Sequence, residues 1–577
     1  MKASHTIRPV FDDPNLVSTA GLVPAMLLAE SAGLHDLLAE QVSVTSLNAA
    51  VKAASVVGGM LAGADSIDDL DLLRHGGMDR LFAGVRAPST LGTFLRSFTH
   101  GHVQQLDAVG GHLLAGLTCR VPGMIAGAAT DQGLAFLDVD DTIREVHGYR
   151  KQGAGYGYTR VRGLNIQLAA LSTPLAAPVI VRARLRKGST SSARGAGRML
   201  AQAITTARAS GVKGHLLCRA DSAYYGWAFV GAALRAKAWF SVTARMTKKV
   251  SATIAGIAED DWQPIKYPQA VYDEAEQRWI SDAEVAEVGF VAFTGRRKAE
   301  HVPCRLVVRR VKRLQPLASD GSEQQELFAA YRHHAFITNT TFTMVEADQL
   351  HRDHAIVEQV IAELKDGPLA HLPSGKYAAN AAWVALAVIA FNIARAAAIA
   401  ANLTKARWAT LRRKLINVPA RIAATGRRLV LHLPTHWPWA DAWEALHAVA
   451  TSPPRTATPS PPSPSRAQPE DPVEKPDRPA DPPRPHQRTT LRTDARNHQK
   501  SRSVDQGSGL QGVPEVGSRQ SSCGAQGPAH QAHGGIRWPT SSRPADTSGA
   551  WQNSPGRATT RDAASRSVQL GRCWRSR

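Results

Sequence analysis

The sequence predicts a mixed α/β protein with a helical segment before the sheet and, after it, a tail that forms no hydrophobic core. Three observations predict this class. Apolar runs of strand length alternate with helical patterns from residue 131 onward, residues 15–125 show only helical periodicity, and the last 127 residues are rich in Pro, Ser, Arg and Gly. At 577 residues the chain is long enough for several domains.

The first 130 residues are predicted to form a helical DNA-binding domain. Leucines recur at helical spacing, and Pro88 opens a helix on which Arg96 lies opposite an apolar face. Such a helix suits a DNA groove, although an ordinary helical bundle with a polar outer face explains the same pattern. The periodic residues are Leu22, Met26, Leu27, Leu34, Leu70, Leu73 and Leu81, and the polar face adds Thr90 and Thr93 to Arg96.

Residues 131–249 predict the first part of a mixed sheet with helices against it. Three strands come first, followed by a helix, a strand, a second helix and a last strand. The strands read GLAFLDVDDT, LNIQLAAL, PVIVRARL, GHLLCRADS and WFSVTARM, and the helices are 194–209 and YGWAFVGAALRAKA.

A β-rich insertion is predicted over 250–340, and helices follow it to about residue 450. Thr343 and Glu346 have capping-box spacing, which predicts a helix running to Lys365. The next helix, about 377–400, is almost wholly apolar. Because Asn392 and Arg395 interrupt it, we expect a buried core helix and no membrane span.

The net charge of +21 is unevenly distributed along the chain. Residues 1–130 carry a net −3, residues 131–450 a net +15 and residues 451–577 a net +9. The last segment holds 18 of the 34 prolines and neither Phe nor Tyr, so we predict a disordered basic tail. The basic excess of 131–450 suggests a polyanionic partner such as nucleic acid.

Cysteine usage and the N-terminus bear on the compartment. The five cysteines form no CxxC pair, which disfavours a disulfide scaffold or a cysteine zinc site. No apolar segment follows the first charges, so no signal peptide is expected. These features predict a cytoplasmic protein.

Three acidic residues are candidates for metal chemistry. Asp140 and Asp221 each end a predicted strand, and strand ends in an open α/β sheet are where ligand sites form. Glu358 lies on the capped helix after the insertion. Carboxylates brought together repel unless a cation lies between them, and such oxygen ligands suit Mg²⁺ or Mn²⁺. Two ions can act on a phosphodiester.

The helix that carries Glu358 has two further interpretations. At about 100° per residue, His351, His354, Glu358 and Lys365 fall within one narrow arc beside an apolar stripe. That arc is also what a solvated charged face looks like. A transition-metal site on the two histidines and the glutamate is a third interpretation, although no HExxH motif is present.

Three blocks resemble the catalytic motifs of bacterial insertion-sequence DDE transposases. They are LDVDDT, RADSAYYG and HRDHAIVEQVIAELK, in that order. The segments ADSIDDLDLLR, PSTLGTFLRSFTHGH, NAAWVALAVIAFNIAR and LPTHWPW are most similar to the thirteen-eighty group of insertion sequences. The resemblance covers about residues 10–450.

The resemblance implies an RNase H-like catalytic core, with a second part at 341–450, and a triad of Asp140, Asp221 and Glu358 that binds two Mg²⁺ or Mn²⁺ ions. Asp138, two residues before Asp140, is a possible substitute. In related transposases a Tyr and an Arg precede the glutamate, and a Lys follows it. Here His351 and His354 stand at the first two positions, and Lys365 keeps the third.

The implied function is cut-and-paste DNA transposition. The partners implied are double-stranded DNA, at the terminal inverted repeats and the target, and a second copy in a homodimer, in the bacterial cytoplasm near the nucleoid. Phosphate contacts are expected from Lys365, His351, His354, Arg96, Arg182, Arg184, Arg186 and Lys187, although the cluster at 182–187 also fits a solvated strand end. The alternatives are an RNase H-like nuclease without strand transfer and an inactive DNA-binding relic.

Overall fold

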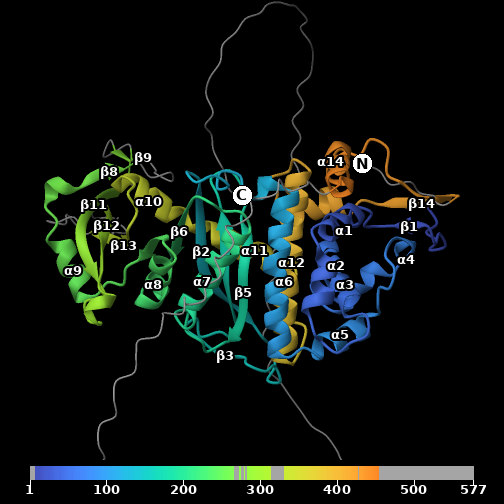
Figure 1. Ribbon diagram of the computed structural model, residues 1–577, viewed down its shortest axis with the longest axis horizontal. Coiled ribbons are helices and arrows are strands. Elements are labelled where there is room, and N and C mark those ends of the chain that lie inside the picture. The colour runs from blue at the N-terminus through green and yellow to red at the C-terminus, as the bar shows by residue number, and fades with distance from the viewer. Residues whose placement is uncertain are drawn as a thin grey trace, which may run out of the picture. The chain divides into compact units, whose positions relative to one another are not determined.

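A computed structural model describes residues 7–265, 272–273, 278–279, 283–312, 331–426 and 428–453. The predicted tail, from residue 454 on, and parts of the predicted insertion lie outside these residues. The strands and helices expected from the sequence between 131 and 249 are present, and the prediction of a mixed α/β protein is confirmed (Figure 1).

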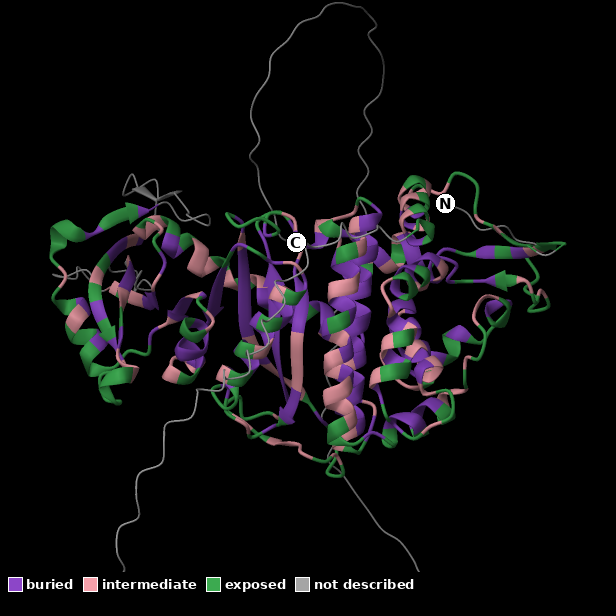
Figure 2. Ribbon diagram, in the orientation of Figure 1, coloured by how far each residue is buried: buried purple, intermediate pink, exposed green. Residues whose placement is uncertain are grey.

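One large sheet organises the chain, in the order β5-β4-β2-β6-β7-β13-β12-β11-β8, with β3 also paired to β4. The first three strands are antiparallel to one another, whereas β2, β6 and β7 run parallel. Both faces of β4 are buried, and the strands in the middle of the molecule are coloured mostly as buried in Figure 2. The bounds are β2 Leu134–Glu145, β3 Gly155–Tyr156, β4 Arg162–Ser172, β5 Val179–Lys187, α7 Ala196–Ala209, β6 His215–Ala220, α8 Trp227–Arg235 and β7 Trp239–Thr243.

The predicted insertion extends this same sheet. β13 pairs antiparallel with β7, and β12, β11 and β8 follow outward. The β-rich character expected for 250–340 is therefore correct, and its strands continue the sheet beyond the last core strand. The elements are α9 Lys248–Ala255, β8 Gln263–Ile265, β9 Tyr272–Asp273, β10 Arg278–Trp279, β11 Ala283–Ala292, β12 Val302–Lys312 and β13 Tyr331–Thr338.

The N-terminal helices pack against C-terminal ones. Helix α6 contacts α12 and β5, α1 contacts α14, and β1 pairs with β14. No boundary separates the helical segment from the sheet within the described residues. The elements are β1 Leu16–Val17, α1 Leu22–Ser31, α2 Leu34–Gln41, α3 Ala49–Ala62, α4 Met78–Leu81, α5 Pro88–Arg96, α6 His100–Arg120, α10 Met344–Arg352, α11 Ile356–Lys365, α12 Tyr377–Ala400, α13 Trp408–Leu411, β14 Ala420–Thr425, β15 Arg428–His432 and α14 Ala440–Thr451.

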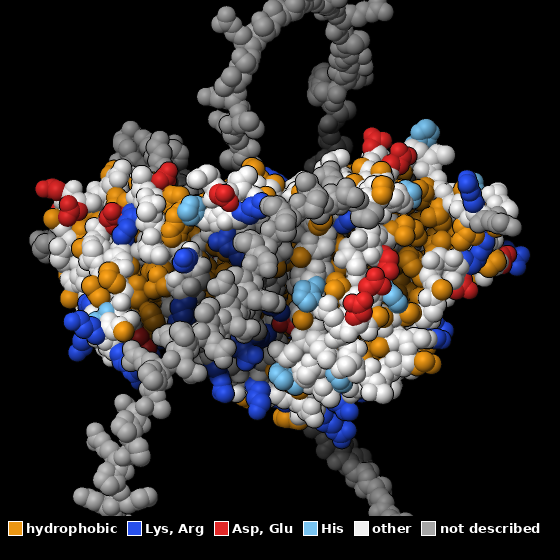
Figure 3. Space-filling view, viewed as in Figure 1, with side chains coloured by type: hydrophobic (Ala, Val, Ile, Leu, Met, Phe, Trp, Pro, Cys, Tyr) orange, Lys and Arg blue, Asp and Glu red, His pale blue; other side chains and the backbone are white. Residues whose placement is uncertain are grey.

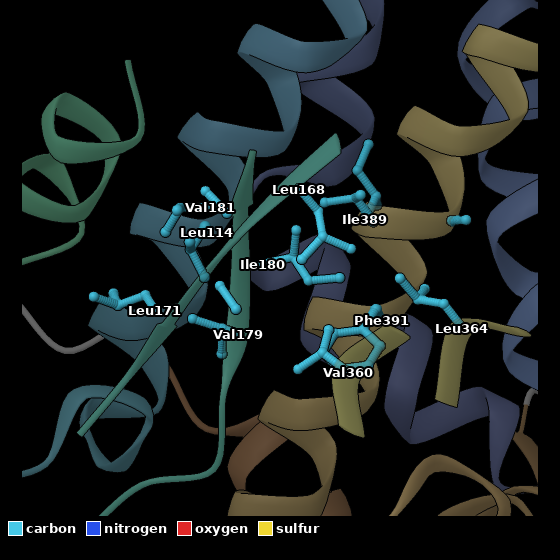
Figure 4. Close-up of a cluster of buried hydrophobic side chains, with 14 of the residues drawn as sticks. Leu114, Leu168, Leu171, Val179, Ile180, Val181, Val360, Leu364, Ile389 and Phe391 are labelled. Carbon is cyan, nitrogen blue, oxygen red and sulfur yellow. The ribbon is translucent and has the colours of Figure 1, made fainter. Parts of the chain in front are cut away.

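Helix α12 forms the centre of the core, as its apolar sequence predicts. It is long and apolar enough to cross a membrane, but 94% of its most apolar window is buried inside the protein. Its side chains meet those of β4, β5, α6 and α11 in one cluster (Figure 4). Burial of such a surface supplies most of the stabilising free energy of a core.

Two buried polar residues of α12, Asn392 and Arg395, bind it to its neighbours. Asn392 accepts from the backbone N–H of Ile180 at 2.9 Å and donates to the Ile180 carbonyl at 2.8 Å, at an irregularity in the β4–β5 pairing. Arg395 is ion-paired with Glu363 of α11 at 2.6 Å, and both side chains are buried. The Asn392 amide and both terminal nitrogens of Arg395 therefore have partners in the core, as buried polar groups require, and only Nε of Arg395 has none among the described residues.

We predict that Arg395→Met lowers the free energy of unfolding by roughly 3–5 kcal/mol, because it leaves the Glu363 carboxylate buried without its cation. Denaturant unfolding measures this. Arg421→Met is the matched control, since Arg421 pairs with Asp13 on the surface and should lose less than about 1 kcal/mol. Equal losses in the two variants would contradict the assignment.

Candidate active site

The register of two parallel strands brings the first two predicted carboxylates together. Strand β2 pairs with β6 through Asp138 opposite Arg219 and Val139 opposite Ala220. Asp140 is the next residue of β2, and Asp221 directly follows the last residue of β6. Strand β2 then continues to Glu145 against β4, so Asp140 does not end its strand, contrary to the sequence prediction. It marks the point where the pairing with β6 stops.

The electrostatics show that Asp140 and Asp221 interact. Burial raises the pKa of Asp140 to about 6, and the nearby carboxylates of Asp221 and Asp141 add to that rise, while a hydrogen bond from the Asp141 N–H and the His354 ring oppose it. Burial likewise raises the pKa of Asp221, although the carboxylate accepts from the N–H of Ala223 at 3.0 Å. The pair therefore concentrates negative charge that the protein's own cations do not neutralise.

Asp138 is a structural residue. It is fully buried, and Arg219 donates to its two oxygens at 2.6 and 2.8 Å. The Nδ1 of His354 lies 3.0 Å from Oδ1 of the same carboxylate. Burial raises the pKa of Asp138, but Arg219 and His354 outweigh it and hold the pKa below its usual value. With both oxygens engaged, Asp138 is a poor substitute for Asp140 as a metal ligand.

Part of the predicted basic cluster also has structural partners. Arg186 is buried and ion-paired with Asp141, and it donates to the Asn165 side chain at 2.8 Å. Arg182 is ion-paired with Asp107 of α6 at 2.5 Å. The half-buried Arg184 donates to Gln202 of α7. Only Lys187 of this cluster is exposed. The structure thus revises the expectation that all four side chains face DNA.

The helix predicted from Thr343 to Lys365 begins at its capping box, as expected, but is interrupted. Thr343 and Glu346 make both reciprocal hydrogen bonds. Helix α10 then ends at Arg352, a 3₁₀ turn spans Asp353–Ala355, and α11 begins at Ile356. Since the helical phase changes at the turn, the predicted histidines and Glu358 do not form one continuous α-helical face.

His351 is enclosed within the fold, which corrects its assignment as a phosphate contact. Its ring stacks on Phe336, with centroids 4.1 Å apart, and its two nitrogens lie 2.8 Å from the Ser241 hydroxyl and 3.0 Å from the Thr243 hydroxyl. Burial lowers the pKa of His351 well below its usual value, and the nearby His354, Arg219 and Arg309 lower it further. A neutral ring in this position ties α10 to β7 and β13.

Glu358 and Lys365 lie on α11, which packs against β2 and β4. Glu358 is exposed in the first turn of this helix. Burial and Arg144 lower the pKa of Lys365, while the Asp140 carboxylate acts in the opposite sense, which places Lys365 within electrostatic reach of Asp140. No group of three or more metal-ligating side chains is assembled among the residues that the structure describes. The strand register thus brings Asp140 and Asp221 together, whereas Glu358 does not form a group of three ligands with them.

A family model described as Transposase DDE domain group 1 matches residues 1–453 of the chain. The chain belongs to the DDE transposases. This family is catalytic and acts in DNA transposition, and its domain implies an RNase H-like fold, which agrees with the β5-β4-β2-β6-β7 strand order. A search of the curated proteins finds no match.

DDE transposases generally use divalent metal ions, and the two aspartates of this transposase fit such an ion. Their oxygens are hard ligands, and burial, with a smaller contribution from the neighbouring carboxylates, raises the pKa of Asp140, which a bound cation would lower again. Asp140 and Asp221 would hold it.

Sequence reasoning missed the residues that support the two aspartates. Arg219 stands next to Ala220 in the RADS block, and Asp141 follows Asp140, so both were within the quoted motifs. An arginine inside an otherwise apolar strand was the available signal, because a charge there needs a buried partner. Nothing local in the sequence identifies Asp138 as that partner.

We predict that Asp140→Asn raises the thermal stability at pH 7–8 and has little effect near pH 4. The folded pKa of about 6 lies above the unfolded value of 3.8, so the unfolded chain releases this proton first and stability falls as the pH rises from about 4 to about 6. Above pH 6 the full cost of the charge is present, and below pH 4 the carboxyl is protonated in both states. Thermal unfolding across this range, without divalent metal, measures the effect. A gain independent of pH would argue against the cost of the buried Asp140 charge as its cause.

The pH dependence of stability that His351 contributes has the opposite sign to that of Asp140. Its folded pKa is depressed, so the unfolded chain takes up a proton first and stability falls as the pH drops below about 6.5. His351→Gln should flatten this acid-side loss. The same variant should leave the salt dependence of DNA binding unchanged, and a reduced slope would restore His351 as a phosphate contact.

Proposed function

We propose that this transposase belongs to the thirteen-eighty group and catalyses cut-and-paste transposition. It would hydrolyse the phosphodiester at each element end and transfer the freed 3′-OH to target DNA. The observation that supports the proposal is the β2–β6 register, in which Asp140 and Asp221 directly follow the paired residues Val139 and Ala220. Asp140, Asp221 and Glu358 are proposed to hold two Mg²⁺ or Mn²⁺ ions, with Glu358 joining when metal and DNA are bound.

The metal, when bound, supplies Lewis acidity at the phosphodiester. The chain's own residues prepare the site. Above pH 6 Asp140 is ionised and ready to accept a cation. The buried Arg219 holds Asp138, and Asp138 in turn holds one ring nitrogen of His354. The other ring nitrogen of His354 remains for a DNA phosphate, in the role that the family gives to arginine.

We propose DNA backbone contacts for four members of the predicted set, of which Lys187 and Arg96 are exposed and Lys365 and His354 are half-buried. Lys365, His354, Lys187 and Arg96 remain candidates, while Arg182, Arg184 and Arg186 position the strands that carry them. Figure 3 shows Lys and Arg side chains gathered on the middle of one face, where Figure 1 places α7 and β3. These contacts set affinity and register.

The N-terminal helices are proposed to bind DNA through α5. Leu91, Phe94 and Leu95 of this helix are buried, while Thr93 and Arg96 are exposed. A surface groove of about 370 Å³ lies along it, lined by Thr45, Ser46, Lys52, Ser89, Thr90, Thr93, Phe94 and Ser97. Hydroxyls and a lysine of this kind suit phosphate oxygens. Because two element ends must be cut together, a homodimer on DNA is part of the proposal.

Two other functions make distinguishable predictions. An RNase H-like nuclease would cut DNA without joining the product to a plasmid target. An inactive relic, which the exposed and separate position of Glu358 would allow, would bind repeat DNA without cutting it in Mg²⁺ or Mn²⁺. A strand-transfer assay separates all three.

We predict that Asp221→Ala abolishes Mg²⁺-dependent cleavage of a duplex carrying the inverted repeats that flank the gene, while DNA binding remains measurable. Asp79→Ala is the matched control, because Asp79 is exposed on α4 and should cut normally. Normal cleavage by Asp221→Ala would refute the proposed site.

Binding to the same duplex should weaken steeply as salt rises, because phosphate contacts release counterions. Each of Lys187→Ala and Arg96→Ala should reduce the log–log slope by roughly one. A flat slope for the parent chain would contradict the basic-surface argument.

A further inference from the structure

The segment between β2 and β4 concentrates exposed aromatic rings. We call residues 146–161 the tyrosine loop. Tyr149, Tyr156 and Tyr158 are 94%, 66% and 69% exposed, and they are the only exposed tyrosines among the residues whose burial the structure describes. Three large rings exposed to water within ten residues do not stabilise the fold, so they indicate a binding surface.

The tyrosine loop is anchored at several points. Arg162 donates to the carbonyls of Val146, Gly148 and Tyr149. The N–H of Gln152 donates to the Gly375 carbonyl at 2.9 Å, in the segment between α11 and α12. On the other side, the Gly188 N–H donates to the Gly153 carbonyl at 3.0 Å. These bonds hold the loop between the end of β5 and the chain that leaves α11, so its rings are presented on a fixed backbone.

The loop packs against β2 close to Asp140, because a Cβ on Gly157 would lie 3.8 Å from Cδ1 of Ile143, three residues further along the strand. Gly157 packs so closely that a Cβ there would come within 2.6 Å of the Gly188 carbonyl oxygen, next to the exposed Lys187. Tyr158 follows directly. Burial raises the pKa of Tyr158, and Asp141, Asp140 and Asp221 raise it further, so its hydroxyl lies within electrostatic range of all three carboxylates.

The charges of the loop favour nucleic acid as the occupant. Residues 146–161 contain Arg150, Lys151 and Arg160 and no acidic residue. Arg150 and Arg160 are exposed, and the guanidinium of Arg162 lies 5.4 Å from the Tyr149 ring centroid. Aromatic rings interleaved with cations are how proteins hold single strands, since every base has a face that can stack and every nucleotide a phosphate.

We propose that Tyr156 and Tyr158 stack on unpaired nucleobases of the DNA end while Arg150, Arg160 and Lys187 bind the adjoining phosphates. The inference rests on the proposed function for its location, because the unpaired bases would be those next to the bond that Asp140 and Asp221 serve. Opening the end of a duplex costs stacking free energy, and the exposed rings replace part of that stacking. The tyrosine loop is thus a platform for a frayed DNA end.

Fluorescence anisotropy with the full chain tests this proposal. The probes are a dye-labelled duplex with unpaired ends and a blunt duplex of the same sequence, both without divalent metal so that nothing is cut. The parent chain should prefer the frayed duplex. Tyr158→Ala and Tyr156→Ala should each lose about tenfold in affinity for it, and less than about twofold for the blunt duplex.

Two controls separate stacking from other effects. Tyr158→Phe keeps the ring and should bind both probes as the parent does. Arg160→Ala removes a phosphate contact and should weaken both probes alike, with a smaller salt slope. Because the rings are exposed, all variants should unfold at the parent's temperature.

The outcomes are separable from those of the proposed function, because this assay needs no cleavage. The platform is overturned if the parent binds the frayed and blunt duplexes equally well. It is also overturned if the alanine variants keep the parent's affinity for the frayed duplex, or lose affinity equally for both duplexes. A chain that cuts DNA but shows any of these results keeps its proposed function and loses the platform. If the parent chain never cuts DNA but Tyr158→Ala abolishes its preference for the frayed duplex, the platform is supported and the proposed function is not.

Discussion

The buried ion pair between Asp138 and Arg219 is the interaction on which the site depends. It joins β2 to β6 two residues before Asp140 and Asp221. Arg219 also donates to the Leu350 carbonyl of α10 at 2.5 Å, and Asp138 binds His354 in the turn that follows. One pair of charges therefore sets the strand register and positions the segment leading to Glu358. Removing either partner would leave the other buried and uncompensated, which costs several kcal/mol.

Buried polar contacts also join the core to other elements. Asn392 and Arg395 of α12 bind β5 and α11, and Arg186 of β5 is ion-paired with Asp141 of β2, next to Asp140. Each of these polar groups lies in apolar surroundings, where leaving it without a partner would be costly. The position of its partner is therefore closely constrained. The apolar clusters supply stabilisation, and these polar contacts fix the position of α11 and of the carboxylates relative to the sheet.

Sequence periodicity predicted most of the elements because it reports directly on burial. The strands from 131 to 249, the capping box at Thr343 and the apolar helix at 377–400 all followed from local patterns. Long-range partners could not be read in the same way. The pattern that placed His351 beside Glu358 assumed an unbroken helix, and it could not reveal Phe336, Ser241 and Thr243 around the ring. The arginines at 182–186 looked like a basic surface because their acceptors lie on other elements or in distant loops.

Iron-directed cleavage of the polypeptide tests the central claim that Asp140 and Asp221 together form a divalent-metal site. Fe²⁺ bound in place of Mg²⁺, with ascorbate and peroxide, generates radicals that cut the chain near the ion. The account predicts fragments ending close to residues 140 and 221, suppressed by excess Mg²⁺ and absent in Asp221→Asn, with a further cut near Glu358 when DNA is added. Cuts confined to other parts of the chain, or cuts at these positions that Mg²⁺ does not suppress, would contradict it.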